Sequence, residues 1–169
     1  QFWGFTVSGV DAPVKDNTLR NNTITGFDIG VYVYAANGGG NPADLVKNTT
    51  IVLNEITQND IGIKVKGFKE EADIRLIYND IHGNVDYGVL VESTSLNATF
   101  NYWGCPEGPG NEGCDKVEGN VEYEPWLKDS AFNPPVIYNP QVIPSNIVDE
   151  TIYTNDNTPT ISVRTDRPS

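Results

Sequence analysis

Asn54-Glu-Ile-Thr-Gln-Asn-Asp-Ile-Gly-Ile-Lys-Val-Lys66 is one of three stretches of this 169-residue chain that can be aligned with one another. The other two are Asn22-Thr-Ile-Thr-Gly-Phe-Asp-Ile-Gly-Val-Tyr-Val-Tyr34 and Asn79-Asp-Ile-His-Gly-Asn-Val-Asp-Tyr-Gly-Val-Leu-Val-Glu92. Self-similarity of this kind is typical of repeat proteins, in which each unit buries its apolar face against its neighbours. The stretches therefore predict a stacked architecture. They say little about activity, because stacked folds include enzymes, adhesins and structural proteins.

Equivalent positions of the repeat carry the same kinds of residue. Each unit begins with an Asn, has an apolar residue two positions later, and contains a Gly that precedes alternating apolar residues, as in a β-strand. These positions are Asn22, Asn54, Asn79 and, in a degenerate fourth unit, Asn101; Ile24, Ile56, Ile81 and Trp103; and Gly30, Gly62 and Gly88. The apolar positions lie 32, 25 and 22 residues apart. Because the motifs keep their order while the spacing varies, we expect a coil of short strands with loops inserted near 35–43 and 67–73.

The Asn column has a physical explanation in such a coil. Asn tolerates the left-handed backbone of a sharp bend, and its side-chain amide can hydrogen-bond the amide of the next unit. We therefore expect the four Asn residues to adopt the bend and to form a ladder. The alignment also places Asn21 in a column with Leu53, Tyr78 and Phe100, expected to point inward, and reads 4–9 as an earlier partial unit with Val7 in the Ile column.

The repeat, together with Asn97-Ala-Thr-Phe-Asn-Tyr-Trp-Gly104 and Gly119-Asn-Val-Glu-Tyr-Glu-Pro-Trp-Leu127, resembles the right-handed parallel β-helix repeats of archaeal and bacterial cell-surface (surface-layer-type) proteins. The resemblance covers about 4–127. It implies an all-β chain in which 1–127 form a short right-handed parallel β-helix of about four to five rungs. The Trp-Gly segment and the loop that follows it would close the helix.

A different organisation is expected after this domain. Residues 128–150 are predicted to be a Pro-rich linker, because Pro residues in series resist continuous sheet ladders. Ile152-Tyr-Thr-Asn-Asp-Asn-Thr-Pro-Thr-Ile-Ser-Val-Arg164 resembles the opening of bacterial immunoglobulin-like (Ig-like) modules, so 151–169 would be an incomplete Ig-like strand segment. Either the sequence stops within that module, or its strands pair with another chain.

Composition and cysteine content narrow the classes of partner. The formal net charge of −12 argues against nucleic acid and anionic membrane surfaces, and we expect no membrane span because no run of about 20 apolar residues occurs. Cys105 and Cys114 flank a short Gly/Pro loop, which predicts a disulfide. A zinc site is not expected, because it would need further ligands and the sequence offers none nearby. A disulfide indicates an oxidising, extracellular or cell-surface location.

Outward residues after each Gly are predicted to form two columns, Tyr32-Lys64-Leu90 and Tyr34-Lys66-Glu92. Adjacent strands lie about 4.8 Å apart, so Lys66 would meet both an aromatic ring and a carboxylate, in a cation–π contact and an ion pair. One interpretation is structural stacking. The other is a carbohydrate-binding strip of Tyr32, Tyr34, Lys64, Lys66 and Glu92, or the basic residue of a lyase acting on acidic glycans.

Three further features bear on function. His82 and Asp80 lie on another outward face, but without a nucleophile they are not a catalytic triad. The acidic loop 107–124 predicts a Ca²⁺ site at Glu112, Asp115 and Glu118, although no other cofactor is expected. Asn-x-Thr sequons predict N-glycosylation at Asn21, Asn48 and Asn97.

Two functional hypotheses follow from the sequence. The first is a structural or adhesive module of an extracellular cell-surface or filamentous assembly, which associates with itself or with other surface proteins through β-strand contacts. The second is a polysaccharide-binding or polysaccharide-cleaving protein. The sequence assigns no catalytic residue.

Overall fold

A computed structural model of the chain describes residues 2–9, 13–35, 46–67 and 73–132. These residues form strands and no helix, and every pairing between their strands is parallel. None of them therefore forms a helix able to span a membrane. The chain divides into the units 1–135 and 136–169. Most of the predicted linker 128–150, and the whole predicted Ig-like segment 151–169, lie outside the described residues.

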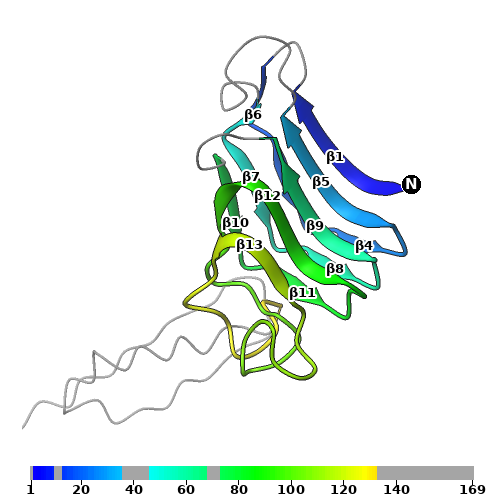
Figure 1. Ribbon diagram of the computed structural model, residues 1–169, viewed down its shortest axis with the longest axis vertical. Coiled ribbons are helices and arrows are strands. Elements are labelled where there is room, and N and C mark those ends of the chain that lie inside the picture. The colour runs from blue at the N-terminus through cyan, green and yellow to red at the C-terminus, as the bar shows by residue number, and fades with distance from the viewer. Residues whose placement is uncertain (1, 10–12, 36–45, 68–72, 133–169) are drawn as a thin grey trace, which may run out of the picture. The chain divides into compact units, whose positions relative to one another are not determined.

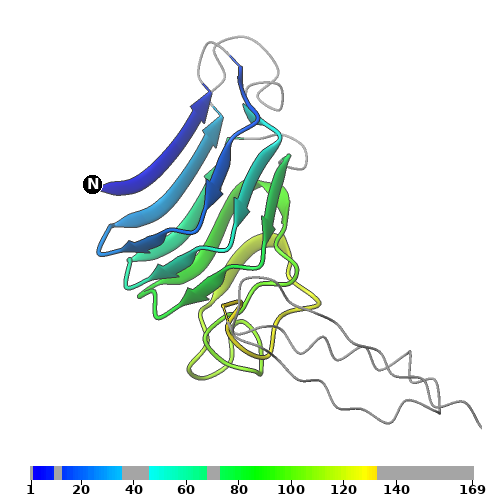
Figure 2. The ribbon, with the colours of Figure 1, turned by 180° about the vertical axis from the view of Figure 1, so that it is seen from behind.

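Each repeat unit contributes one strand to each of three parallel sheets (Figures 1 and 2). The first unit provides β3 (Thr18–Arg20), β4 (Thr23–Thr25) and β5 (Ile29–Ala35); the second provides β7 (Thr49–Val52), β8 (Glu55–Thr57) and β9 (Ile61–Lys66); the third provides β10 (Ile74–Ile77), β11 (Asp80–His82) and β12 (Tyr87–Asn97). The sheets are β3-β7-β10, β4-β8-β11 and β1-β5-β9-β12-β13, where β1 is Trp3–Gly9 and β13 is Val117–Glu122. Strands β2 (Val14–Lys15) and β6 (Val46–Lys47) form a small additional sheet. The all-β arrangement is compatible with a parallel β-helix.

The strand register confirms the predicted apolar columns. Ile24 pairs with Ile56, and Ile56 pairs with Ile81. Val31, Ile63 and Val89 pair in series, as do Val33, Val65 and Val91. All of these side chains belong to one buried core cluster. The core is thus built of stacked apolar columns, each contributed by residues far apart in the sequence.

The Gly column follows from the close approach of successive units. A Cβ on Gly30 would lie 2.7 Å from the carbonyl oxygen of Gly62, and a Cβ on Gly62 would lie 2.6 Å from that of Gly88. Only a residue without a side chain fits here. Gly4 stands in the same relation to Gly30, at 2.6 Å.

Strand β1 therefore supplies the third strand of a unit, and Val7 lies opposite Val33. The predicted placement of Val7 in the column of Ile24 is wrong. The Gly, and not the branched apolar residue, is the position that fixes the alignment, because a backbone oxygen fills the space of its side chain.

The predicted Asn ladder is confirmed. At each step the Oδ1 atom of one Asn accepts two hydrogen bonds from the Asn of the preceding unit, one from its backbone N–H and one from its Nδ2. The two distances are 3.1 and 3.1 Å from Asn22 to Asn54, 3.0 and 3.0 Å from Asn54 to Asn79, and 2.9 and 3.0 Å from Asn79 to Asn101. Asn54, Asn79 and Asn101 are fully buried. Buried polar groups need such partners, so the ladder specifies the register of the units.

The left-handed backbone lies one residue before the Asn, contrary to the expectation that the Asn itself adopts it. The backbone φ is +57° at Asn21, +54° at Leu53, +53° at Tyr78 and +58° at Phe100. Each following Asn donates from Nδ2 to the carbonyl oxygen two residues before it, and so closes the bend around the left-handed residue. This column points outward: Asn21 is exposed, and the predicted inward orientation of Asn21 is wrong.

A second ladder, which the sequence analysis missed, runs through Asn59, Asn84 and Asp115. Asn59 donates from its backbone N–H and its Nδ2 to Asn84 Oδ1, at 3.1 and 3.0 Å. Asn84 Nδ2 donates to Asp115 Oδ2 at 2.6 Å. The left-handed residue again comes first, as Gln58 and Gly83. The last member is the carboxylate of Asp115, which directly follows Cys114 of the disulfide.

The final described segment covers the end of the core. Trp103 is fully buried, and the backbone N–H of Ile81 donates to the neighbouring Tyr102 carbonyl at 2.8 Å. The predicted disulfide between Cys105 and Cys114 is present. Trp126 Nε1 donates to the Pro106 carbonyl at 3.1 Å and holds the loop in place.

Replacing Asn79 with Ala is expected to destabilise the protein by about 3 kcal/mol or more. The change leaves buried partners of Asn79 without hydrogen bonds, and each such group costs about 1–3 kcal/mol. Asn22→Ala is the matched control: Asn22 is exposed at the head of the same ladder, and we expect a loss of less than about 1 kcal/mol. Urea unfolding of both variants measures the difference, and equal losses would contradict the ladder's role.

Candidate functional site

The predicted outward columns on the five-stranded sheet are confirmed in register. Tyr32 pairs with Lys64, which pairs with Leu90, and Tyr34 pairs with Lys66, which pairs with Glu92. The structure therefore brings together Tyr32, Tyr34, Lys64, Lys66 and Glu92 on β5, β9 and β12. We call these five residues, with Trp3, the aromatic–charged strip.

Glu92 binds both lysines of the strip. Its Oε1 lies 2.6 Å from Lys64 Nζ, and its Oε2 lies 2.9 Å from Lys66 Nζ. The predicted ion pair of Lys66 is therefore present. The predicted cation–π contact of Lys66 is absent, since the one such contact among the described residues is Lys128 over Trp126, at 4.6 Å. The carboxylate draws the ammonium group away from the tyrosine rings, because an ion pair with a hydrogen bond is the stronger interaction.

The ion pairs set the protonation of the strip. Hydrogen bonds from Lys64 and then Lys66 hold the pKa of Glu92 below its ordinary value. The hydrogen bond to Glu92 raises the pKa of Lys66. Burial raises the pKa of Tyr32, and the nearby Lys66 opposes that effect. These directions keep Lys66 a cation, Glu92 a carboxylate and Tyr32 a neutral phenol at neutral pH.

The aromatic part of the strip is larger than the sequence analysis predicted. The ring of Trp3 lies 5.2 Å from that of Tyr32, and the rings of Tyr32 and Tyr34 are stacked at 5.7 Å. Trp3 is 47% exposed. The signal that could have identified it is the alignment of Gly4 with Gly30, which places Trp3 opposite Ile29 in β5. An open row of aromatic rings flanked by charges suits a sugar chain, which offers both apolar faces and polar groups.

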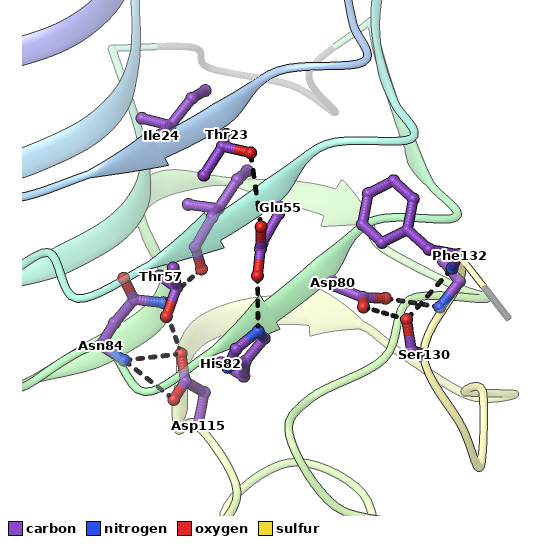
Figure 3. Close-up of polar contacts among 12 residues, drawn as sticks. Thr23, Ile24, Glu55, Thr57, Asp80, His82, Asn84, Asp115, Ser130 and Phe132 are labelled. Carbon is purple, nitrogen blue, oxygen red and sulfur yellow. Dashed lines mark hydrogen bonds and ion pairs between the residues drawn. The ribbon is translucent and has the colours of Figure 1, made fainter.

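The second outward face holds two separate polar clusters (Figure 3). Thr23 Oγ1 donates to Glu55 Oε2 at 3.3 Å, and His82 Nε2 lies 3.6 Å from Glu55 Oε1. Asp80 is buried and turns away from His82 to accept hydrogen bonds from the Ser130 hydroxyl and from the Ala131 N–H. The two residues singled out in the sequence thus have different partners, and Asp80 anchors the segment after β13.

The predicted Ca²⁺ ligands are not gathered into one cluster. Asp115 is buried, and its carboxylate accepts hydrogen bonds from Asn84, while Glu112 is exposed. Burial raises the pKa of Asp115. Among the described residues one acidic and thiol cluster has ligand-like spacing, Cys105, Glu107 and Cys114, but its two sulfur atoms form the disulfide.

The three sequons differ in environment. Asn21 and Asn48 are exposed at left-handed bends, and Asn48 Nδ2 donates to Asp16 Oδ1 at 2.6 Å. Asn97 is partly buried; its Nδ2 donates to Glu122 Oε2 at 3.1 Å, and its Oδ1 accepts from the Thr99 hydroxyl at 2.9 Å. Asn21 and Asn48 therefore offer more accessible side-chain amides than Asn97 does.

Comparisons of the chain with protein-family models, with curated proteins and with solved structures found no significant match. Functional inference therefore depends on the geometry above.

Asp115→Asn is expected to stabilise the protein at neutral pH. Because the pKa of Asp115 is raised above 3.8 in the folded state, the folded protein binds more protons than the unfolded one above that pH, and stability falls as pH rises through this window. Asn keeps the acceptor for Asn84 and carries no charge. We expect the melting temperature to rise by about 2–4 °C at pH 7, and the gain to shrink as the pH falls towards 3.8, below which Asp115 is protonated in both states. An Asp115→Asn variant that is less stable than the parent at pH 7, or that gains less at pH 7 than at acidic pH, would contradict this account.

Proposed function

We propose that this chain is a short right-handed parallel β-helix that serves as a structural and adhesive module of an extracellular cell-surface or filamentous assembly. Stacked parallel strands with satisfied side-chain ladders support a rigid scaffold. The disulfide between Cys105 and Cys114, which the spacing of the two residues predicted, supports an oxidising location. In this proposal, copies associate through β-strand contacts.

One observation carries the proposal of self-association: β3 and β4 are edge strands of their sheets on the side of the first unit. The N–H of Glu55 donates to Asn22 O, and that of Asp80 donates to Asn54 O. The equivalent group in the first unit is the N–H of Thr23, which therefore points to the open edge. Asn22 likewise heads its ladder, and no described residue donates to its Oδ1.

The two ends of the stack differ in a way that favours one association surface. At the far end, Trp103, the disulfide loop and Trp126 cover the core. At the near end, no described strand pairs with the outer side of β3 or β4, and the edge of a sheet is a template for pairing with another strand. Association of two copies through β3 and β4 would pair these edges.

Thr23→Pro is expected to weaken association and preserve the fold. Proline removes one of the N–H groups that point to the outer edge of β4, and proline is tolerated on an edge strand in that orientation. Thr23→Ala is the control, because it also removes the hydroxyl that bonds Glu55 but keeps the N–H. Light scattering across a concentration series measures association. A parent protein that stays monomeric at every concentration, or a proline variant that associates like the parent, would refute the proposal.

A second candidate function, binding of acidic polysaccharide, is favoured by the aromatic–charged strip. Trp3, Tyr32 and Tyr34 supply apolar faces, and Lys64 and Lys66 supply cations for carboxylates. A lyase base must be unprotonated to accept a proton, whereas the raised pKa of Lys66 keeps it protonated at neutral pH. The strip therefore favours binding over cleavage.

Two substitutions with opposite expected effects test this second function. Tyr32→Ala should weaken binding of an oligogalacturonate by about fivefold to tenfold, because it removes the middle ring of the row. Glu92→Gln should strengthen binding, because it releases two ammonium groups from their carboxylate. Isothermal titration calorimetry at low and high salt provides the measurement. If both variants bind as the parent does, the strip is not the binding surface.

A further inference from the structure

The covering of one end of the stack limits how two copies of the chain can pair through their strands (Figures 1 and 2). At the far end, Tyr102 pairs with Asp80 of β11, and Phe100 accepts from the N–H of Tyr78 after β10. On the side of the first unit, no described strand pairs with the outer side of β3 or β4. Two copies that pair through these edges therefore use the same surface twice. Copies that share one surface in this way are related by a two-fold axis.

The hydrogen bonds within the stack show which backbone groups point to this edge. Along a strand, successive residues direct their N–H and C=O groups alternately to the two sides. Asn17 O accepts from the Thr50 N–H on the β7 side, and Asn22 O accepts from the Glu55 N–H on the β8 side. The groups that point to the outer edge therefore belong to the residues one and three positions after each of these acceptors, which are Thr18 and Arg20 in β3, and Thr23 and Thr25 in β4.

A two-fold axis through the bend at residues 21–22 brings these edges together. The chain approaches the bend along β3 and leaves it along β4, so the axis places β3 of one copy beside β4 of the other in the antiparallel direction. The residues nearest to the bend then face each other first, and the rest follow in order. The opposite pairs are Arg20 with Thr23, Leu19 with Ile24, and Thr18 with Thr25.

This register agrees with the backbone directions and with the burial of the side chains. Both members of the first and third pairs direct their backbone groups to the shared edge, as the hydrogen-bonded pairs of an antiparallel ladder do. Leu19 and Ile24, the middle pair, are 7% and 6% exposed and belong to the core cluster, so pairing would continue the core from one copy into the other. The lengths also match, since β3 and β4 have three residues each and β1 has seven.

Arg20 supplies a charge that fits this arrangement. It is exposed, and no carboxylate in the described segments forms an ion pair with it. In the dimer it lies opposite Thr23 of the second copy, and beyond that Thr23 lies Glu55, which accepts from the Thr23 hydroxyl at 3.3 Å. The spacing of strands puts Arg20 and this Glu55 about 10 Å apart between their Cα atoms, a distance that two long side chains can bridge. The two-fold axis forms this contact twice.

We propose that two copies of the chain associate head to head about this axis, and that β3 of each copy pairs antiparallel with β4 of the other. This dimer presupposes the self-association proposed above and adds the partner strand, the register and the number of copies. Because the dimer uses the outer edge of β3 and β4 in both copies, an assembly of more than two copies would need a second surface.

Disulfide cross-linking tests the register. Thr18→Cys and Thr25→Cys are prepared as separate variants of the full chain. The Cα atoms of a hydrogen-bonded antiparallel pair lie about 5.5 Å apart, within the range of a disulfide. We expect a covalent dimer when the two variants are mixed under mild oxidation. Either variant alone should give about tenfold less, because its two thiols lie on opposite sides of the bend, beyond the reach of a disulfide. Non-reducing electrophoresis measures the yield, and mass spectrometry identifies the linked peptides.

Charge exchange tests the contact between Arg20 and Glu55. Arg20→Glu and Glu55→Arg should each weaken association by about tenfold, because each variant places like charges together twice in its dimer. An equal mixture of the two variants should recover the parental affinity to within about twofold, since every Glu of one variant then faces an Arg of the other. Sedimentation velocity measures all three samples, and the recovery controls for any effect of either substitution on the fold.

The results distinguish this dimer from self-association of another kind. A parent protein that associates while the mixed thiol variants form no cross-link between residues 18 and 25 would overturn the dimer and leave self-association in place. Equal cross-linking of each thiol variant alone, or no recovery when the charge variants are mixed, would do the same. A parent protein that stays monomeric at every concentration would refute both the dimer and the self-association on which it rests.

Discussion

The fold depends on one constraint, the vertical stacking of identical side-chain positions in successive units. The Asn ladder expresses it most clearly, because each buried Oδ1 has its two donors only when the Asn of the preceding unit is in register with it. A slip by one residue would bury an unsatisfied amide and move the Ile column out of the core. The same constraint explains why a Gly recurs where the carbonyl of the next unit occupies the space of a side chain.

Function then becomes a question of what the stack leaves uncovered. Residues that face inward form the ladders and the core. A partner can therefore contact only the outward columns and the strand edges. The outward columns of β5 and β9 gather tyrosines and lysines, and those at the bends gather Tyr78 and Phe100. Two sheets have edge strands on the side of the first unit, β3 and β4, whose outer side no described strand pairs with. At the other end Tyr102 pairs with Asp80 of β11, and Phe100 accepts from the N–H of Tyr78 after β10.

Much of the fold could be predicted from the sequence, because a repeated column is visible wherever the same residue recurs in register. Ile24, Ile56 and Ile81, the Asn ladder and the paired columns of the strip were all found in this way. The position of the left-handed bend was missed by one residue, since Leu53, Tyr78 and Phe100 show no preference for that conformation. The neighbouring Asn hydrogen bonds, and not the intrinsic preference of the residue, impose it.

The features that the sequence could not supply depend on contacts between unlike residues. Asp115 ends the second ladder as a carboxylate, and Asp80 accepts from Ser130 fifty positions later. Neither contact repeats, so no periodic signal marks it.

The most direct test of the stacked register is methyl NMR of a sample labelled at the isoleucine methyl groups. Adjacent strands about 4.8 Å apart should give cross-relaxation peaks between Ile24 and Ile56 and between Ile56 and Ile81. Ile24 and Ile81, two strands apart, should give a much weaker peak or none. Absence of both neighbour peaks, or a peak between Ile24 and Ile81 as strong as the neighbour peaks, would contradict the stack and every functional proposal built on it.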